Sequence, residues 1–266
     1  PATNTGNIVV NHKLTGAGTM DLVGIEFAAG YNGGGYLQLR NTANDFSGAF
    51  NVNTNAVLEA NSSSGTGNTL GTASVNLNGG VLRIRDQGDN TSAAQTLTYG
   101  NNVILSANSM IDPDRQGSTA SNKTVALGTL SLPAAGPVVL STPYGTSASI
   151  AANNYRLAFN QVDGPGTLVI GGTRYVDING YGAGFSGNIE VAGPQGMSLT
   201  ASGNLTLNAA TNALNSFTVG GFHTMAGGKT VTAANLTISP NTSITNGLGG
   251  VTTGELGGAM LISNTA

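Results

Sequence analysis

Apolar residues along this chain recur at every second position in short bursts, each bounded by Gly, Asn, Ser or Thr. A period of two indicates a β-strand with one face turned inward, whereas no stretch keeps a helical period for the ~10–12 residues that a helix needs. Representative bursts are Leu37/Leu39, Phe50/Val52, Val75/Leu77, Val125/Leu127, Leu168/Ile170 and Ile189/Val191. The pattern predicts that Ile170 and Val191 point into a core and that Asn51 points outward.

Two parts of the chain repeat the same motifs in the same order. Residues 14–24 read LTGAGTMDLVG and are followed by NDFSGAFNV, whereas residues 162–172 read VDGPGTLVIGG and are followed by GFSGNIEV. Ordered internal similarity is typical of repeat architectures. We therefore predict one continuous all-β solenoid over residues 1–266, with the internal repeat at about 14–84 and 162–207. Rungs of ~20–25 residues would give roughly 11–13 of them.

The turns between bursts favour this solenoid over an antiparallel sandwich, because hairpin pairs of equal length are not visible. Gly and Asn tolerate the positive φ that corners require, as at Asn78-Gly79. Pro133, Pro137 and Pro143 lie close together and lack ladder donors, so residues 132–145 are predicted to form a loop excursion. Residues 112–122 are predicted to form a second one.

Composition narrows the possible partners. Only 8% of the 266 residues are charged and the net charge is −3, so no basic stripe is available to bind nucleic acid. No apolar run approaches the ~20 residues of a membrane-spanning helix. The chain has no cysteine, which excludes disulfides and thiolate metal sites.

Several of these segments resemble a known family, the autotransporter-associated β-strand repeat. The residues that carry the likeness are GPGTLVI at 164–170, GFSGNIEV at 184–191, GAGTMDL at 16–22, NDFSG at 44–48 and the LG…VNLNGGVL tail at 70–82. The resemblance covers about two thirds of the chain, and residues after Leu214 match only in style.

This resemblance implies a right-handed parallel β-helix from a bacterial surface or secreted protein. Such stalks are usually passenger segments of very large proteins, and no translocator-barrel pattern of alternating segments with aromatic girdles accompanies this one. The shared motif is structural and brings no catalytic residue and no cofactor with it. It implies an extracellular location.

Acidic residues offer the first candidates for chemistry. Asp112 and Asp114, beside Arg115, form the tightest group, and Asp86 with Asp89 the next; either pair could hold an acid and a base of a glycan-degrading β-helix. Asp112 also begins a partial match to a calcium loop, although Lys123 stands where that loop needs a bidentate Glu. Solvated turn carboxylates are the alternative interpretation, and we assign no catalytic residue.

Tyrosines offer the second set. Tyr31 and Tyr36 occupy places in the first repeat comparable to those of Tyr175 and Tyr181 in the second, so the four could form a sugar-stacking platform. The alternative is that they cover the corners of the rod.

Three functions follow from these observations. The first is a non-enzymatic extracellular scaffold, stalk or filament segment; the second is a glycan- or host-binding adhesin module; the third is a polysaccharide-degrading enzyme. The segments at 7–11 and 259–263 read as ordinary strands without a cap, so we expect further rungs or other copies of the chain as partners at the ends of the solenoid.

Overall fold

The computed structural model of the chain describes residues 8–24, 36–62, 68–116, 120–133, 136–143 and 154–192 apart from 173, 181 and 186–187, and thereafter strands only. All named elements in this described part are β-strands, distributed over sheets of 11, 9 and 2 strands. The all-β prediction is confirmed.

The strands of the 11-stranded sheet follow one another at every rung. In spatial order they are β1 (Ile8–Val10), β3 (Tyr36–Leu39), β5 (Val57–Ser62), β7 (Val81–Asp86), β10 (Ser109–Asp114), β12 (Pro137–Thr142), β14 (Thr167–Gly172), β16 (Asn188–Ala192), β18 (Thr211–Val219), β20 (Thr230–Ile238) and β22 (Met260–Ile262).

The 9-stranded sheet forms the second wall. Its strands are β2 (Thr19–Leu22), β4 (Ala49–Asn53), β6 (Ser74–Asn78), β8 (Gln95–Thr98), β9 (Val103–Ala107), β11 (Lys123–Ser131), β13 (Arg156–Asp163), β15 (Tyr175–Ile178) and β17 (Leu205–Leu207). The 2-stranded sheet pairs β19 (Phe222–Met225) with β21 (Ser243–Asn246).

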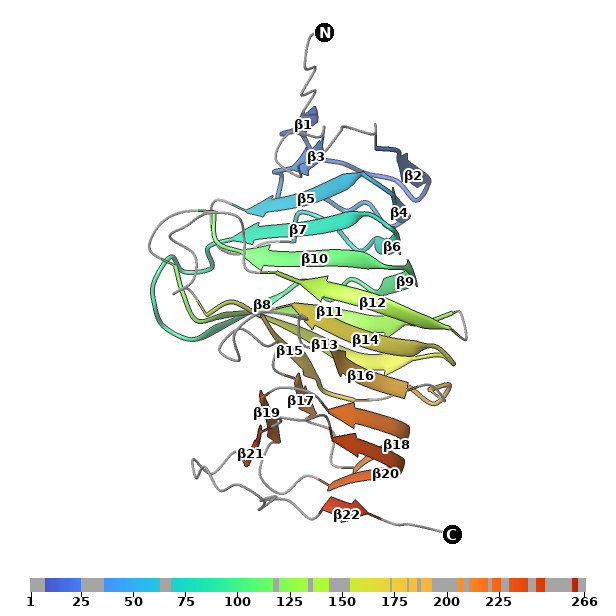
Figure 1. Cartoon of the computed structure of the whole chain (residues 1–266). Coiled ribbons are helices and arrows are strands. Elements are labelled where there is room, and N and C mark those ends of the chain that lie inside the picture. Colours follow the sequence, from blue (N-terminus) through green and yellow to red (C-terminus); the bar gives the residue numbers. More distant parts are fainter. Residues whose placement is uncertain are drawn as a thin grey trace, which may run out of the picture.

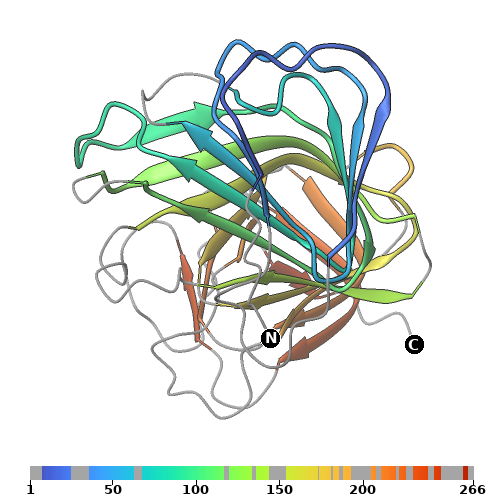
Figure 2. The ribbon, with the colours of Figure 1, turned by 90° about the horizontal axis from the view of Figure 1, so that it is seen from above.

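From β1 to β18 the chain alternates between the two large walls, apart from the consecutive strands β8 and β9, and returns to each wall one rung further along. From β18 to β22 it alternates between the 11-stranded and the 2-stranded sheet. Every pair of named strands is parallel, as Tyr36 against Val57 and Thr19 against Ala49 illustrate. Figure 1 shows the strands stacked from β1 at one end to β22 at the other, and Figure 2 shows the rungs overlying one another along the stack. This arrangement is a parallel β-solenoid, as the sequence predicts.

Rung length is not constant, which explains why the sequence period is hard to see. Glu59 lies 21 residues after its neighbour Gln38, whereas Asn51 lies 30 residues after its neighbour Asp21. Insertions at the corners change the sequence distance between rungs without changing the strand pairing.

The core is a narrow aliphatic column between the walls. Phe50, Val75 and Val103 come from three successive rungs and are fully buried. Ile170 is 1% exposed, so its predicted inward direction is confirmed. Val191 pairs with Ile170 through the backbone, while its side chain lies outside the described residues.

The two sequence repeats fall on opposite walls. The first GxGT motif leads into β2 and the first Phe-Ser-Gly into β4, both in the 9-stranded sheet. The second copies lead into β14 and β16 of the 11-stranded sheet. Within each copy the two strands pair with one another. The motif therefore specifies a turn followed by a strand and does not specify the wall.

The predicted excursion at 112–122 needs correction, because Asp112, Pro113 and Asp114 form the end of β10 and pair with Arg83, Ile84 and Arg85. Met110 donates its N–H to the carbonyl of Gly80, on the side of β7. Backbone nitrogens along a strand point alternately to its two neighbours, so the nitrogen of Pro113, three residues later, faces β12. Pairing with β12 ends at Met110, so the N–H that proline lacks is not needed there.

The predicted excursion at 132–145 is also partly wrong, because Pro137–Thr142 forms β12 within the 11-stranded sheet. Pro137 is the first residue of the strand, a position at which proline is tolerated. A row of closely spaced prolines therefore marks the start of a strand here as well as a loop.

Candidate functional site

The solenoid widens at β8, and polar side chains fill the added space. β8 and β9 together pair with the single long strand β11, so this rung has an extra half-strand that β6 lacks. At the new corner the parallel register aligns Gln95, Lys123 and Tyr155 on successive rungs. Arg174 continues this row on the next rung, because the residues that follow Tyr155 and Arg174, namely Arg156 and Tyr175, are register partners. Lys123 and Arg174 are fully buried, and Tyr155 is 1% exposed.

Asp86 is the residue that joins the two walls at this corner. Its Oδ1 accepts the N–H of Gly88 at 2.9 Å, and its Oδ2 accepts the hydroxyl of Tyr99 at 3.0 Å. Its backbone carbonyl accepts the hydroxyl of Tyr155 at 2.5 Å. One residue at the end of β7 therefore holds the corners of two later rungs.

Burial sets the protonation behaviour of this group. Desolvation raises the pKa of Asp86, and the bonds from Gly88 and Tyr99 oppose the rise. Desolvation, together with the nearby Asp86 carboxylate, raises the pKa of both Tyr99 and Tyr155. Both tyrosines are therefore neutral donors at ordinary pH.

Lys123 fixes the loop that follows Asp86. Its ammonium pairs with Asp89 and also donates to the carbonyl of Ala93 at 2.7 Å. The hydrogen bond from Lys123 lowers the pKa of Asp89 to about 2. Because Lys123 is fully buried, this pair ties the exposed loop at 87–94 to the interior of the solenoid.

Arg174 supplies a second buried cation. Its guanidinium lies 3.5 Å from the Asp114 carboxylate and 5.9 Å from the centre of the Tyr155 ring. Asp114 is 1% exposed, so both charges of this pair are removed from water. A buried pair costs desolvation that its attraction roughly offsets, so its main effect is to fix geometry rather than to add stability.

Together these contacts form a buried polar cluster, defined here as Asp86, Tyr99, Lys123, Tyr155, Arg174 and their partners Asp89 and Asp114. The cluster brings carboxyl groups close to two cations and two hydroxyls, as an acid–base site would. Its contacts, however, join one part of the chain to another. An acid–base site needs a carboxyl group within reach of a substrate. The cluster is therefore arranged to brace the rungs.

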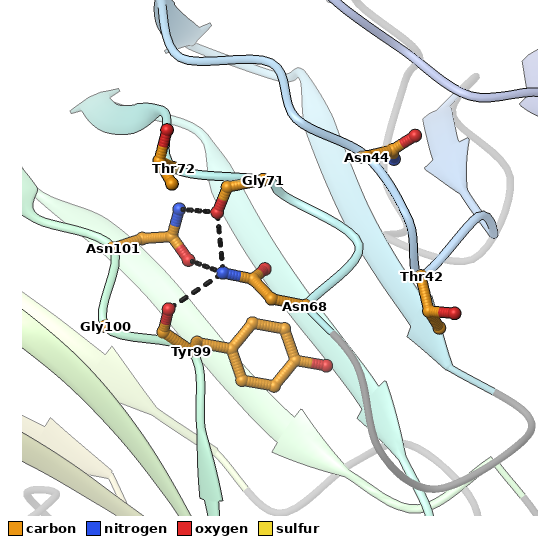
Figure 3. Close-up of a pocket in the computed structure, with 8 residues that line it drawn as sticks. All are labelled: Thr42, Asn44, Asn68, Gly71, Thr72, Tyr99, Gly100 and Asn101. Atoms are coloured by element: carbon orange, nitrogen blue, oxygen red, sulfur yellow. Dashed lines mark hydrogen bonds between the residues drawn. The ribbon is translucent and has the colours of Figure 1, made fainter.

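A pocket of about 290 Å³ lies beside this cluster, at the step where the solenoid widens. Figure 3 shows Asn68, Gly71, Asn101 and Tyr99 on one side of it, and Thr42 with Asn44 on a neighbouring segment. The backbone carbonyl of Tyr99 accepts a hydrogen bond from Asn68 in this pocket, and the hydroxyl of Tyr99 reaches Asp86.

The amides of this pocket already have partners. Asn68 Nδ2 donates to the carbonyls of Gly71 and Tyr99 and to Oδ1 of Asn101, at 2.7, 2.8 and 2.7 Å (Figure 3). Asn44 accepts the N–H of Leu14 and donates to the carbonyl of Thr69. The asparagines of three rungs thus close the corner of the solenoid, and a ligand would meet the hydroxyls of Thr42 and Thr72.

Asparagines also form a row on the face of the 9-stranded sheet. Asn51 Nδ2 donates to Asp21 at 2.5 Å, and Asn76 Nδ2 donates to Asn51 at 2.7 Å. In the next row Asn78 Nδ2 donates to Asn53 at 3.3 Å. Such ladders add side-chain bonds parallel to the backbone ladder.

The structure separates the predicted metal candidates. Asp112 accepts Arg85 Nη2 at 2.5 Å, whereas Asp114 faces Arg174 in the buried polar cluster. Each carboxylate thus has an arginine as its counter-ion. Within the described residues, no group of three or more His, Cys, Asp or Glu side chains could hold a metal ion.

Two of the four tyrosines of the predicted platform lie in the part of the chain that the structure describes. Tyr36 begins β3 of the 11-stranded sheet, and Tyr175 begins β15 of the 9-stranded sheet. Tyr31 and Tyr181 lie outside the described residues. The two described tyrosines thus lie on different walls, and the comparison of Tyr31 and Tyr36 with Tyr175 and Tyr181 stays a prediction.

Sequence reasoning missed Lys123, Tyr155 and Arg174, although a signal was present. Each stands two residues before a buried apolar pair on an alternating strand: Val125/Leu127, Leu157/Phe159 and Val176/Ile178. Extending the period of two backwards by one step places all three on the inward row.

Comparison with known proteins does not assign the chain to a family. No protein-family model matches the chain, and neither the curated proteins nor the solved structures contain a significant match. The described residues also include no helix with the length and apolarity that a membrane crossing requires.

Proposed function

We propose that this chain is a non-enzymatic structural segment, a stiff extracellular scaffold or stalk built as a β-solenoid. One observation carries the proposal: its polar side chains are bonded from rung to rung. The asparagine rows, the pocket amides and the buried polar cluster all link neighbouring rungs. A rod that resists bending and unwinding needs such links along its length.

The resemblance to the autotransporter-associated β-strand repeat supports the finer part of this proposal. It implies a bacterial surface or secreted protein, and the parallel solenoid fits that expectation in architecture. We further propose that additional rungs, or another copy of the chain, add at the β1–β2 end. Among the described residues the exposed large apolar side chains are Ile8, Val9 and Val23, all at this end of the stack.

The test combines shape, resistance and turnover on the full chain. A scaffold gives rods by negative-stain electron microscopy, withstands protease at concentrations that degrade globular controls, and shows no turnover of polyuronides. Light scattering over a range of concentrations shows whether copies associate. A compact, protease-sensitive chain would overturn the proposal, as would a polyuronide-cleaving activity.

A second function, glycan binding, has one observation in its favour. The pocket of about 290 Å³ offers the hydroxyls of Thr42 and Thr72, groups that bind sugar hydroxyls, beside amides that are already bonded within the chain. Its test is a glycan array with the wild-type chain and with Thr72→Val, which removes an exposed pocket hydroxyl. Binding that the variant loses would make the chain an adhesin module rather than only a scaffold.

A further inference from the structure

Asp86 connects three parts of the chain that are far apart in sequence. The carboxylate binds Gly88 of the following loop and Tyr99 at the end of β8, and the backbone carbonyl binds Tyr155, 69 residues away. Among the named strands β8 pairs only with β11, so one of its two edges has no strand partner. The position of the segment from 87 to 101 therefore depends strongly on its contacts with Asp86.

Several titratable and charged groups lie near Asp86 and bear on its protonation. The titratable and charged groups of this corner are Asp89 from its own loop, Asp114 and Arg115 from the end of β10, Lys123 from β11, Tyr99 after β8, Tyr155 before β13, and Arg174 before β15. Lys123 is paired with Asp89, and Arg174 faces Asp114. Asp86 is held by neutral hydroxyl and amide donors instead.

We propose that the Asp86 carboxyl group is a proton-operated clamp that holds the segment 87–101 against the solenoid more tightly in acid than at neutral pH. Uptake of one proton removes a negative charge from a site 2% exposed to solvent. The Tyr99 hydroxyl can both donate and accept, so it keeps a bond to Asp86 in either protonation state. The clamp therefore stays assembled on protonation, and removing the cost of burying the charge outweighs the weakening of the hydrogen bonds from Gly88 and Tyr99. This inference does not depend on the proposed scaffold role.

The direction follows from linkage. Burial raises the pKa of Asp86 in the closed state above 3.8, its ordinary value, which the solvated open state keeps. Below 3.8 both states are protonated and the clamp is at its tightest. As pH rises through the window between the two pKa values, the open state gains by up to about tenfold per pH unit. Asp89 titrates below this window, because its pKa is lowered to about 2.

Hydrogen exchange of the full chain tests this directly. The probes are the amides of Gly88, Tyr99 and Gly100, which donate to Asp86 and Ala126. Exchange is measured from pH 4 to 8 and divided by the intrinsic rate of an unfolded peptide of the same sequence. We expect protection to fall with rising pH at these amides and to stay constant at Val75 and Val162.

Three variants distinguish the clamp from general packing. Asp86→Asn abolishes the pH dependence. Tyr99→Phe removes a bond that lowers the pKa of Asp86, so the dependence persists and moves to higher pH. Tyr155→Phe removes the bond to the backbone carbonyl, so protection falls at every pH while the midpoint stays near that of the wild type.

The proposal is overturned if protection is independent of pH in the wild type, if it rises with pH, or if the dependence survives in Asp86→Asn. Should Asp86→Asn not fold, the midpoint of the pH dependence tests the clamp in the two tyrosine variants. It should move to higher pH in Tyr99→Phe and stay near the wild-type value in Tyr155→Phe. A shift of the midpoint in neither variant, or an equal shift in both, contradicts the clamp.

Discussion

Arg85 binds Asp112 of the adjoining strand twice, through the carboxylate Oδ2 at 2.5 Å and the backbone carbonyl at 2.7 Å. Asp112 is 5% exposed, and Arg85 is the cation that its carboxylate pairs with. The contact explains why the first acid of a calcium-like sequence serves here as a strand-to-strand link.

Replacing Arg85 by Met should lower the free energy of unfolding by about 1–3 kcal/mol, because a buried carboxylate loses a charged donor. Chemical denaturation measures this. The double variant Arg85→Met/Asp112→Leu should lose less than the sum of the two single changes, since no charge is then left unpaired. Wild-type melting should not respond to calcium or EDTA; a calcium-dependent rise would contradict the pairing.

Ile170→Asp should destabilise the chain by several kcal/mol, because it places an unpaired charge in the core. Asn51 gives the comparison. From the sequence it is an outward residue whose change to Asp should have little effect, but its amide donates to Asp21, so Asn51→Asp sets two carboxylates side by side. We expect a loss of ~0.5–1 kcal/mol that salt reduces. Equal losses in thermal melts of the two variants would refute the assigned register.

Gly71→Ala should cost ~1–3 kcal/mol, since φ is 66° and a Cβ atom would lie 2.5 Å from the carbonyl oxygen of Phe46. Two controls separate strain from contact. Gly16 has φ 106° with nothing within 4 Å, so its change to Ala reports backbone strain alone. Gly18 has neither feature, and Gly18→Ala should be neutral. Melting temperatures that do not follow the order Gly71, Gly16, Gly18 would count against this corner geometry.

Below pH 3.8, under the window in which Asp86 titrates, acid should weaken the loop at 87–94 through Asp89. Its pKa is about 2 in the folded chain against 3.8 unfolded, so the stabilisation is present above pH 3.8 and is lost as pH falls towards 2. Lys123→Met should remove this acid sensitivity in melting curves recorded between pH 2 and 5. The matched control is Lys13→Met, which removes the partner of the 57% exposed Asp45. This variant should leave the pH profile of melting unchanged. Persistence of the slope in Lys123→Met would mean that another carboxyl group causes it.

The alternation of apolar residues was enough to predict the strands and the inward direction of Ile170, because both depend on local periodicity. The solenoid followed from the internal repeat and its Gly- and Asn-rich turns, and its parallel strands from the family resemblance. The wall to which a motif belongs depends on how many residues the preceding corners contain, and corners tolerate insertions freely. For this reason the two GxGT motifs lead into strands of different sheets, β2 and β14, despite their similar sequence. Pro113 could not be placed in a strand from sequence alone, because its missing N–H is harmless only where pairing with β12 has ended.

The buried polar cluster was predictable in part. The inward positions of Lys123, Tyr155 and Arg174 follow from extending the local period. The partners of these residues do not, since Asp86 and Tyr155 meet only through stacking of rungs 69 residues apart. The sequence grouped Asp86 with Asp89 and Asp112 with Asp114 by proximity along the chain, whereas the fold turns Asp86 and Asp114 towards Tyr155.

The asparagine rows also bear on how the molecule ages. Asn-Gly steps lose ammonia when the following backbone nitrogen attacks the side-chain amide and closes a succinimide ring, and water then opens this ring to leave a carboxylate. At Asn78-Gly79 both reacting groups are occupied, because the amide donates to Asn53 and the Gly79 nitrogen donates to Ser109 Oγ at 2.9 Å. An intact rung therefore delays its own deamidation. Opening of this rung frees both groups to react and would leave a negative charge at position 78, so the deamidated fraction of Asn78 would record how often this corner has opened.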